Sequence, residues 1–308
     1  MEENKPLVSF VINCYNGEKY LKKCFASLLN QTYQNWELIF WDNASIDKSA
    51  EIFNTHKDSR FKYFKSKINV TLGQARAWAV DQCNGEYIGF LDVDDEWLPS
   101  KTEIQISQMM SENTHLSYTS IYLKINEKIS STSIPKYNSG YLFDKQLERF
   151  EINMPSSMIK TEALKALNIN FDPRIVASEE FDLFMQIAAK YKISVIKQPL
   201  CIYRVSNGSL TNLSVEHRAQ DKKYTFEKLE NNYAEQVLKY KKSYLKAKAK
   251  ISYYEFQYFY SIENYSIAKK KLKKVFFIDF RYSLIFISLY IYPKLYKNIL
   301  KLYDGRGI

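Results

Sequence analysis

The sequence predicts an α/β fold with a mainly parallel central sheet, followed by a helical region. Over the first two thirds of the chain, apolar runs rich in β-branched and aromatic residues alternate with segments of helical periodicity. Several of the apolar runs also end in a polar residue. The 308 residues are 46% hydrophobic and 25% charged, which is ordinary globular composition. Strands that alternate with helices form βαβ units, and these units build parallel sheets.

The first ninety residues contain four predicted strands and three predicted helices. The predicted strands are the apolar runs Leu7–Asn13, Trp36–Trp41, Phe61–Phe64 and Glu86–Leu91. The predicted helices carry apolar residues at helical spacing and are Glu18–Asn30, Asp47–Asn54 and Gly73–Cys83. Asn13, Asp42 and Asp92 stand at the carboxyl ends of three of the strands. Open α/β sheets bind ligands at these ends, so we expect the three side chains to meet in one crevice.

The middle of the chain has a less regular pattern. We expect further strands at Ser117–Ile125, Pro155–Ile159 and Ile193–Lys197, and a helix at Glu179–Ala189. We expect loops at the polar segment Glu127–Ser139 and at Tyr203–Ser214, where Asn-Gly and many hydroxyl groups indicate mobility.

The most informative stretch is 88–99, in which an apolar run ends in Asp92, Asp94 and Asp95. Clustered carboxylates repel one another and destabilise a fold unless a cation neutralises them. Oxygen ligands favour Mg²⁺ or Mn²⁺ over zinc, and such an ion usually shares its coordination with substrate phosphates. These residues therefore predict a hard-cation site at a strand end. The alternative is a solvated acidic turn that caps a helix.

Charge divides the chain into two regions. Residues 215–308 contain 20 Lys and Arg against 9 Asp and Glu, together with 14 of the 25 tyrosines, whereas residues 1–214 are nearly neutral. We therefore predict a catalytic domain at 1–214 and a helical, Tyr- and Lys-rich region at 215–308. Long helices are expected at Tyr224–Lys250 and Tyr253–Lys274.

The basic region suits an anionic membrane surface. Its apolar run at Tyr282–Tyr292 has 11 residues, which is too short to span a bilayer. Basic helices with aromatic residues lie in the membrane interface, so we expect peripheral membrane contact through residues 215–308. The alternative is that these helices pack on the catalytic domain. No nucleic-acid-binding motif is present, so we expect no nucleic-acid partner.

The cysteines and histidines of the sequence argue against two kinds of catalytic or metal site. The four cysteines are far apart and the chain has three histidines, which argues against a zinc site and a Ser-His triad. No secretory signal opens the sequence, and we expect a cytoplasmic location at the inner face of the cell membrane.

Five segments, in this order and spacing, resemble family 2 glycosyltransferases. They are Val8–Asn16, Ser27–Tyr33, Trp36–Asp47, Gly85–Pro99 and Ser178–Phe184. The resemblance covers residues 6–214 and implies the GT-A fold, a nucleotide-sugar-binding α/β domain. It also implies inverting, metal-dependent transfer of a sugar from a nucleoside diphosphate sugar, with UDP-sugar expected, to a hydroxyl of a glycan acceptor. We expect that acceptor to be a glycan or lipid-linked glycan in lipooligosaccharide, capsule or other surface polysaccharide synthesis.

The resemblance also implies roles for individual residues on the donor side. Asp94 and Asp95 match the metal-binding part of the family's DxD motif and would hold Mn²⁺ or Mg²⁺. Asp92 and Val93 form the start of that motif, where Asp92 meets the ribose or orders the turn. Asp42 matches the acidic position that reads the uracil or ribose edge; its alternative is a cap for the next turn.

Further donor-binding positions follow from the same resemblance. Cys14, Tyr15 and Asn16 stand beside the nucleotide in the family pattern. Arg76 matches an arginine near the donor, although the usual Arg-Asn pair is Arg-Ala here, and its alternative is an exposed helix arginine. The family commonly has a histidine where Ser206 stands, in a loop that can contact the diphosphate. Because this chain lacks that histidine, Arg204 is the best remaining candidate for the contact.

The acceptor side departs from the family pattern. A carboxylate opposite the leaving group takes the proton of the attacking hydroxyl. The family usually has Glu-Asp where this chain has Glu179-Glu180, so Glu180 occupies the base position. Asp182 is expected to orient the acceptor, with an ordinary acid in the first turn of a helix as the alternative.

Two other function classes stay open. A nucleotidyltransferase uses a similar sheet but requires a glycine-rich phosphate loop after the first strand, where the sequence offers only Asn16-Gly17. A non-catalytic nucleotide-sugar or glycan-binding module is compatible with the unusual Glu179-Glu180 pair.

Overall fold

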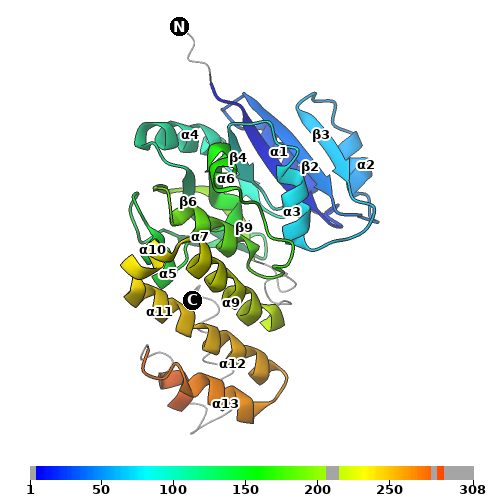
Figure 1. The fold of residues 1–308 in the computed structure, drawn as a ribbon. Coiled ribbons are helices and arrows are strands. Elements are labelled where there is room, and N and C mark those ends of the chain that lie inside the picture. Colours follow the sequence, from blue (N-terminus) through cyan, green and yellow to red (C-terminus); the bar gives the residue numbers. More distant parts are fainter. Residues whose placement is uncertain (1–4, 206–214, 279–282, 288–308) are drawn as a thin grey trace. The chain divides into compact units, whose positions relative to one another are not determined.

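The computed structural model describes residues 5–205, 215–278 and 283–287 (Figure 1). The chain divides into two compact units, one of residues 1–143 and 151–209 and the other of residues 144–150 and 210–308. A short segment from the middle of the sequence therefore belongs to the C-terminal unit. No helix within the described ranges is long and apolar enough to cross a membrane.

The first unit is built on one sheet, which has nine strands in the described part of the chain. Their spatial order is β3-β2-β1-β4-β8-β6-β9-β5, and β7 pairs with β6. The strands are β1 (Val8–Cys14), β2 (Trp36–Asp42), β3 (Phe61–Lys65), β4 (Tyr87–Phe90), β5 (Glu96–Trp97), β6 (Leu116–Ile125), β7 (Lys128–Ser133), β8 (Ser157–Lys160) and β9 (Ile193–Arg204).

The sheet is mixed. Strands β3, β2, β1 and β4 are parallel neighbours, and β6 is parallel to β9. Strand β8 is antiparallel to both of its neighbours, β7 is antiparallel to β6, and β5 is antiparallel to β9. The predicted α/β class with a mainly parallel sheet is confirmed, with antiparallel strands added in its second half.

Helices cover the sheet of the first unit. They are α1 (Leu21–Leu29), α2 (Ser49–Asn54), α3 (Leu72–Val80), α4 (Lys101–Glu112), α6 (Thr161–Leu167) and α7 (Glu179–Ala188). Strand β1 is almost wholly buried, which explains its continuous apolar run. In α1, Leu21, Cys24, Phe25 and Leu28 face the core, and Phe25 meets Phe40 of β2 edge-on with ring centroids 5.5 Å apart. Burying a Leu or Phe side chain contributes about 1.5–3 kcal/mol, so these contacts hold α1 on the sheet.

The second unit is helical, as predicted. Its helices are α5 (Phe143–Glu148), α9 (Val215–Asn232), α10 (Ala234–Lys239), α11 (Lys241–Ala249), α12 (Ile251–Ser261) and α13 (Tyr265–Lys273). The two long helices expected at 224–250 and 253–274 are wrong in extent. The chain is interrupted around Tyr233 and Tyr240, and again at 262–264, where Glu263 has a positive φ of 60°. Only 283–287 of the predicted apolar run at 282–292 lies within the described residues.

Two predicted loops also need correction. Part of Glu127–Ser139 forms β7, which a two-residue turn at Asn126 and Glu127 joins to β6. Both turn residues have positive φ, 47° and 63°, as a type I′ hairpin turn requires. Strand β7 is exposed and polar, so it lacks the apolar alternation that identifies a strand. Strand β9 continues to Arg204, and the rest of the predicted loop, 206–214, lies outside the described residues.

Candidate functional site

Three parallel strands bring the predicted polar residues to one edge of the sheet. Cys14 and Asp42, the last residues of β1 and β2, are register partners. Leu91, just after β4, donates its N–H to the carbonyl of Val11 at 3.0 Å, so Asp92 follows the strand next to β1 on its other side. The loops after β1, β2 and β4 therefore leave neighbouring strand ends, as the sequence predicts.

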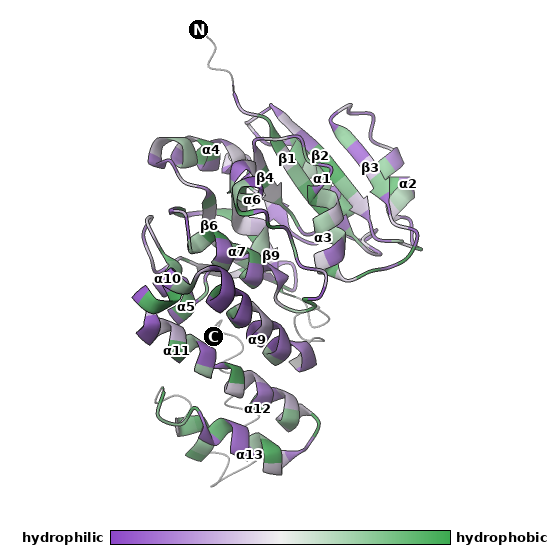
Figure 2. Ribbon diagram, viewed as in Figure 1, coloured by the Kyte–Doolittle hydropathy of each residue, from purple (hydrophilic) through white to green (hydrophobic). Residues whose placement is uncertain are grey.

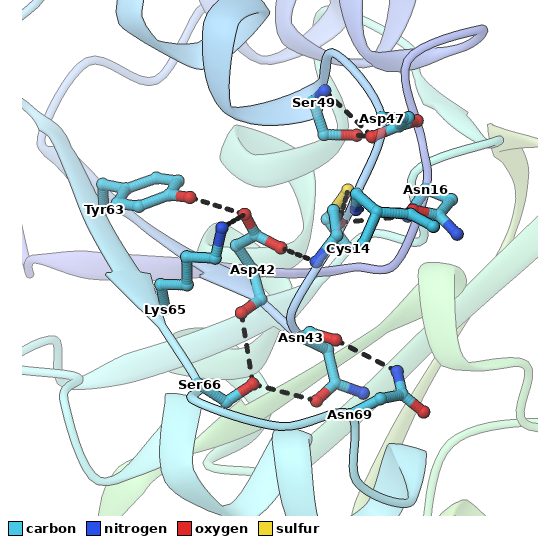
Figure 3. Close-up of polar contacts among 12 residues, drawn as sticks. Cys14, Asn16, Asp42, Asn43, Asp47, Ser49, Tyr63, Lys65, Ser66 and Asn69 are labelled. Atoms are coloured by element: carbon cyan, nitrogen blue, oxygen red, sulfur yellow. Dashed lines mark hydrogen bonds and ion pairs between the residues drawn. The ribbon is translucent and has the colours of Figure 1, made fainter.

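The Asp42 carboxylate organises the loop after β2 (Figure 3). Asp42 is fully buried. Its Oδ1 accepts the Ser45 N–H at 2.7 Å, and its Oδ2 accepts the Tyr63 hydroxyl at 2.5 Å, with Lys65 Nζ at 3.9 Å. Burial and the bond to Asp42 raise the pKa of Tyr63, so this hydroxyl keeps its proton. The Ser45 contact is the turn-capping bond of the alternative interpretation. A contact between Asp42 and a nucleotide stays a prediction.

The loop after β1 is tied to the loop after β2 (Figure 3). Asn16 has a positive φ of 53°, and its N–H bonds to Ser45 Oγ at 3.0 Å. Its side-chain oxygen accepts the Ile46 N–H at 3.0 Å. The Cys14 thiol is buried, which raises its pKa, whereas the Tyr15 side chain is half exposed. Asn16 therefore shapes the loop, and Tyr15 offers the accessible ring at these strand ends.

The acidic turn between β4 and β5 is tightly held. The Asp95 N–H bonds to the Asp92 carbonyl at 3.0 Å, and Val93 packs against the apolar core. Asp95 is 2% exposed. Its Oδ1 accepts the backbone N–H of Arg204 at 2.7 Å, because β5 pairs with β9 and brings the end of β9 to the turn.

Negative charge is concentrated in this turn. Asp95 Oδ2 is buried and has no hydrogen-bond partner among the described residues. Burial and the Asp92 charge raise the pKa of Asp94 to about 6, and burial with the Asp92 and Asp94 charges raises the pKa of Asp95. Within the described ranges, no group of three or more His, Cys, Asp or Glu side chains could hold a metal ion. A magnesium-like ion needs only one or two carboxylates when substrate phosphates complete its shell, so this pair fits such an ion.

Arg204 lies against the acidic turn. Its Nε donates to the Asp94 carbonyl at 3.0 Å, and its guanidinium lies 4.8 Å from the centre of the Tyr20 ring. The guanidinium also pairs with Glu127 at the tip of the β6–β7 hairpin and lies 3.7 Å from Glu96. With 8% of its surface exposed, Arg204 brings positive charge to the place where we predicted a diphosphate contact.

Arg76 links the acidic turn to helix α7. It is 4% exposed, so the alternative of an exposed helix arginine is wrong. Its Nη2 donates to Asp92 Oδ1 at 2.8 Å, and its Nη1 pairs with Glu179. Helix α3 reaches this position because Gly73 allows a close approach: a Cβ there would lie 3.1 Å from the Ile175 carbonyl. Burial and the Glu180 charge raise the pKa of Glu179 to about 7. The positive charge of Arg76 acts in the opposite direction and lowers this pKa.

Helix α7 carries three acidic residues in its first turn. Glu180 is partly exposed, and its charge acts on both Arg76 and Tyr203, which places it near the acidic turn. Asp182 is fully buried and accepts the Gln186 amide at 3.0 Å. Of the two predicted acceptor-side residues, Glu180 therefore has the accessible carboxylate.

Three site residues were missed by sequence reasoning. Tyr63 contacts Asp42, Glu179 holds Arg76, and Glu127 pairs with Arg204. Two of them had a signal in the sequence: Tyr63 lies opposite Phe40 in the predicted parallel sheet, and Glu179 belongs to the Glu179-Glu180 pair that carries part of the family resemblance. The partners of Glu127 and Glu179 lie 77 and 103 residues away, and no local pattern reports such a distance.

Comparison with known proteins identifies the family. The model of the family described as glycosyl transferase family 2 matches residues 9–167. The chain belongs to glycosyltransferase family 2. An uncharacterized glycosyltransferase of Methanocaldococcus jannaschii is 34% identical over 67% of this chain and 73% of its own length. The protein is therefore a glycosyltransferase, as the resemblance implied.

Two more proteins are similar to this chain, one in sequence and one in structure. The UDP-Glc:alpha-D-GlcNAc-diphosphoundecaprenol beta-1,3-glucosyltransferase WfgD of Escherichia coli is 29% identical over 67% of this chain and 80% of its own. The crystal structure of S. aureus TarS 1-349 in complex with UDP-GlcNAc superposes with a TM-score of 0.69 at 16% identity, over 97% of this chain and 91% of that one. This superposition confirms the GT-A fold predicted for the family 2 domain.

Proposed function

We propose that this family 2 glycosyltransferase is a metal-dependent, inverting enzyme that uses a UDP-sugar. One observation carries the proposal: Asp95 is buried with an unpartnered Oδ2 beside the partly exposed Asp94, at the strand ends where α/β sheets bind ligands. The TarS structure contains UDP-GlcNAc and WfgD is a UDP-glucose enzyme, which supports a uridine donor.

Asp94 and Asp95 would hold Mn²⁺ or Mg²⁺. The orphaned Asp95 Oδ2 and the raised pKa values of both carboxyls fit a hard cation, which would remove the repulsion between them. When bound, the ion would offset the negative charge that develops on the departing diphosphate. Arg204, whose Nε donates to the Asp94 carbonyl, is a cation beside the same turn and would contribute to that stabilisation.

The other residues would bind and orient the donor. Tyr15, half exposed after β1, would pack against the nucleotide, with Cys14 and Asn16 shaping the backbone beside it. Asp42 would act mainly by holding the loop after β2 beside the uracil or ribose. Arg76 is enclosed by Asp92 and Glu179, so we propose that it positions the DxD turn and does not touch the donor.

Glu180 would be the general base. A carboxylate at the start of α7 would take the proton from the acceptor hydroxyl as that oxygen attacks the anomeric carbon and the nucleoside diphosphate leaves. The buried position of Asp182 favours its alternative role, an acid that stabilises the first turn of α7, over contact with the acceptor.

The acceptor we propose is a lipid-linked glycan at the inner face of the cell membrane, in the synthesis of a surface polysaccharide. The lipid-linked acceptor in the name of WfgD supports this, as does the basic, aromatic character of residues 215–308.

A donor screen tests the proposal. Release of nucleoside diphosphate would be followed with UDP-, GDP- and dTDP-sugars, with Mn²⁺ and then with EDTA. We expect release from a UDP-sugar that requires the metal. Equal release in EDTA, or release from another nucleotide only, would contradict the proposal.

A further inference from the structure

Helix α13 and the turn after it are strongly basic. Residues 265–278 contain five lysines and no acidic residue. One side of this segment belongs to the core of the second unit: Ala268, Leu272 and Val275 are buried together with Phe256 and Ile285. These three positions have the spacing i, i+4 and i+7, which is one face of a helix.

The opposite side is exposed and combines charge with an aromatic ring. Lys270, Lys273, Lys274 and Phe277 have the spacing i, i+3, i+4 and i+7, and all four are exposed. Phe277 is 95% exposed. Figure 2 shows hydrophobic and hydrophilic residues interleaved along α13. We call these four residues the α13 face.

The lysines of this face are not used by the fold. Lys271 pairs with Glu255 at 2.8 Å, whereas Lys270, Lys273 and Lys274 form no ion pair with a described residue. The Phe277 ring meets the ring of its neighbour Phe276 edge-on, with centroids 4.8 Å apart, but it remains 95% exposed and so buries little apolar surface. Both features suit a surface that is anionic and has an apolar layer beneath it.

We propose that the α13 face docks the protein on an anionic lipid leaflet. The three lysines would lie at the phosphate level, and Phe277 would enter the boundary between headgroups and acyl chains. A nucleic-acid duplex would use the lysines but leave the Phe277 ring in water, because its bases are already stacked, so the face favours lipid over a duplex. The inference rests on the proposed function in one respect, namely that a lipid-linked acceptor explains why the enzyme would dock.

The test uses point variants of the full chain. Deleting residues 275–308 would remove Val275 and Ile285 from the core of the second unit, so a truncation would confuse docking with folding. The test variant is Lys270→Gln/Lys273→Gln/Lys274→Gln. The matched control carries the same charge change on exposed lysines of α11, at Lys241, Lys242 and Lys246. Circular dichroism checks that both variants fold.

Co-sedimentation with phosphatidylglycerol–phosphatidylcholine vesicles, and with pure phosphatidylcholine vesicles, measures docking. A lysine near an anionic surface contributes about 1 kcal/mol, so the test variant should bind the anionic vesicles roughly 100-fold more weakly. The control should lose much less. Phe277→Ser should weaken binding further without changing its dependence on salt.

Several results would overturn the proposal. They are equal binding of the natural protein to the two vesicle types, equal losses in the test and control variants, and tighter binding to an oligonucleotide than to vesicles. Nucleoside diphosphate release, measured without vesicles, reports separately on the proposed function. A protein that releases no diphosphate but shows the expected vesicle binding would contradict only the enzymatic proposal.

Discussion

Replacing Arg76 with methionine removes the cation between two carboxylates of the candidate site. The Arg76 and Glu179 side chains are each 5% exposed, so their ion pair is buried, whereas the Asp92 side chain is 33% exposed. Removing one partner of a buried pair costs about 3–5 kcal/mol, because the other charge stays without compensation. The contact with the more exposed Asp92 is screened by solvent and adds little. We therefore expect Arg76→Met to lower the free energy of unfolding by about 3–4 kcal/mol at pH 7.5.

The loss should shrink as the pH falls. Burial and Glu180 raise the pKa of Glu179 to about 7 even with Arg76 present, and without Arg76 it should rise further. A carboxyl whose pKa is higher in the folded state than in the unfolded state binds a proton more tightly when folded. Its stabilising contribution is complete below the unfolded pKa and is lost as the pH rises through the folded pKa. The Arg76→Met variant should therefore regain stability between pH 7.5 and pH 5.

Urea unfolding followed by tryptophan fluorescence measures this effect. All four tryptophans lie in the first unit, so the signal reports on the unit that contains Arg76. Adding Glu179→Gln to the variant should recover much of the loss, because no buried charge then remains. The matched control is Arg174→Met, whose pair with Asp172 leaves the arginine 70% exposed. A loss no larger than that of the control, or one that does not change with pH, would refute this reasoning.

Two further predictions concern catalysis and the core. Glu180→Gln should leave donor binding intact and lower turnover roughly 100-fold, as measured by diphosphate release with acceptor present. If Asp182→Asn abolished transfer while Glu180→Gln retained it, the base would be misassigned. Lys101 is fully buried against Trp97, and burial lowers its pKa to about 7. Between pH 7 and 10 this lysine is therefore protonated in the unfolded state and largely neutral in the folded state. Each pH unit by which the pH falls through that range lowers the free energy of unfolding by about 1.4 kcal/mol. Lys101→Met should stabilise the protein most at pH 7 or below, and a gain that is independent of pH would contradict this.

The sequence predicted the parallel half of the sheet well because each strand there is a local apolar run with a polar end. Asn13, Asp42 and Asp92 were expected at neighbouring strand ends, and strands β1, β2 and β4 place them there. Strand β7 was missed because its exposed, polar residues carry no hydrophobic pattern. Helix α4 was not predicted either. Its buried side includes two polar residues, Lys101 and Gln105, which are fully buried and bond to each other at 2.6 Å. Buried polar residues on a helix disguise the apolar stripe that periodicity detects.

The sequence predicted which residues belong to the candidate site, but not which of them contact one another. The acidic turn and Glu180 were found from local motifs and from the family resemblance. The burial of Arg76 and its bonds to Asp92 and Glu179 depend on the packing of α3 against a segment about a hundred residues later. Such contacts are tertiary, and no single segment contains them.

The central claim is that Asp94 and Asp95 hold a divalent cation together with the donor diphosphate. Calorimetric titration of UDP in the presence of Mn²⁺ tests it most directly, with Asp94→Asn, Asp95→Asn and a control, Asp81→Asn, an exposed residue that bonds to Asn170. Each site variant removes one negative ligand from a hard-cation site. We expect a loss of UDP affinity of about tenfold or more in both site variants, no change in the control, and no difference among the proteins in EDTA. Unchanged Mn²⁺-dependent affinity in both Asp94→Asn and Asp95→Asn would contradict the claim.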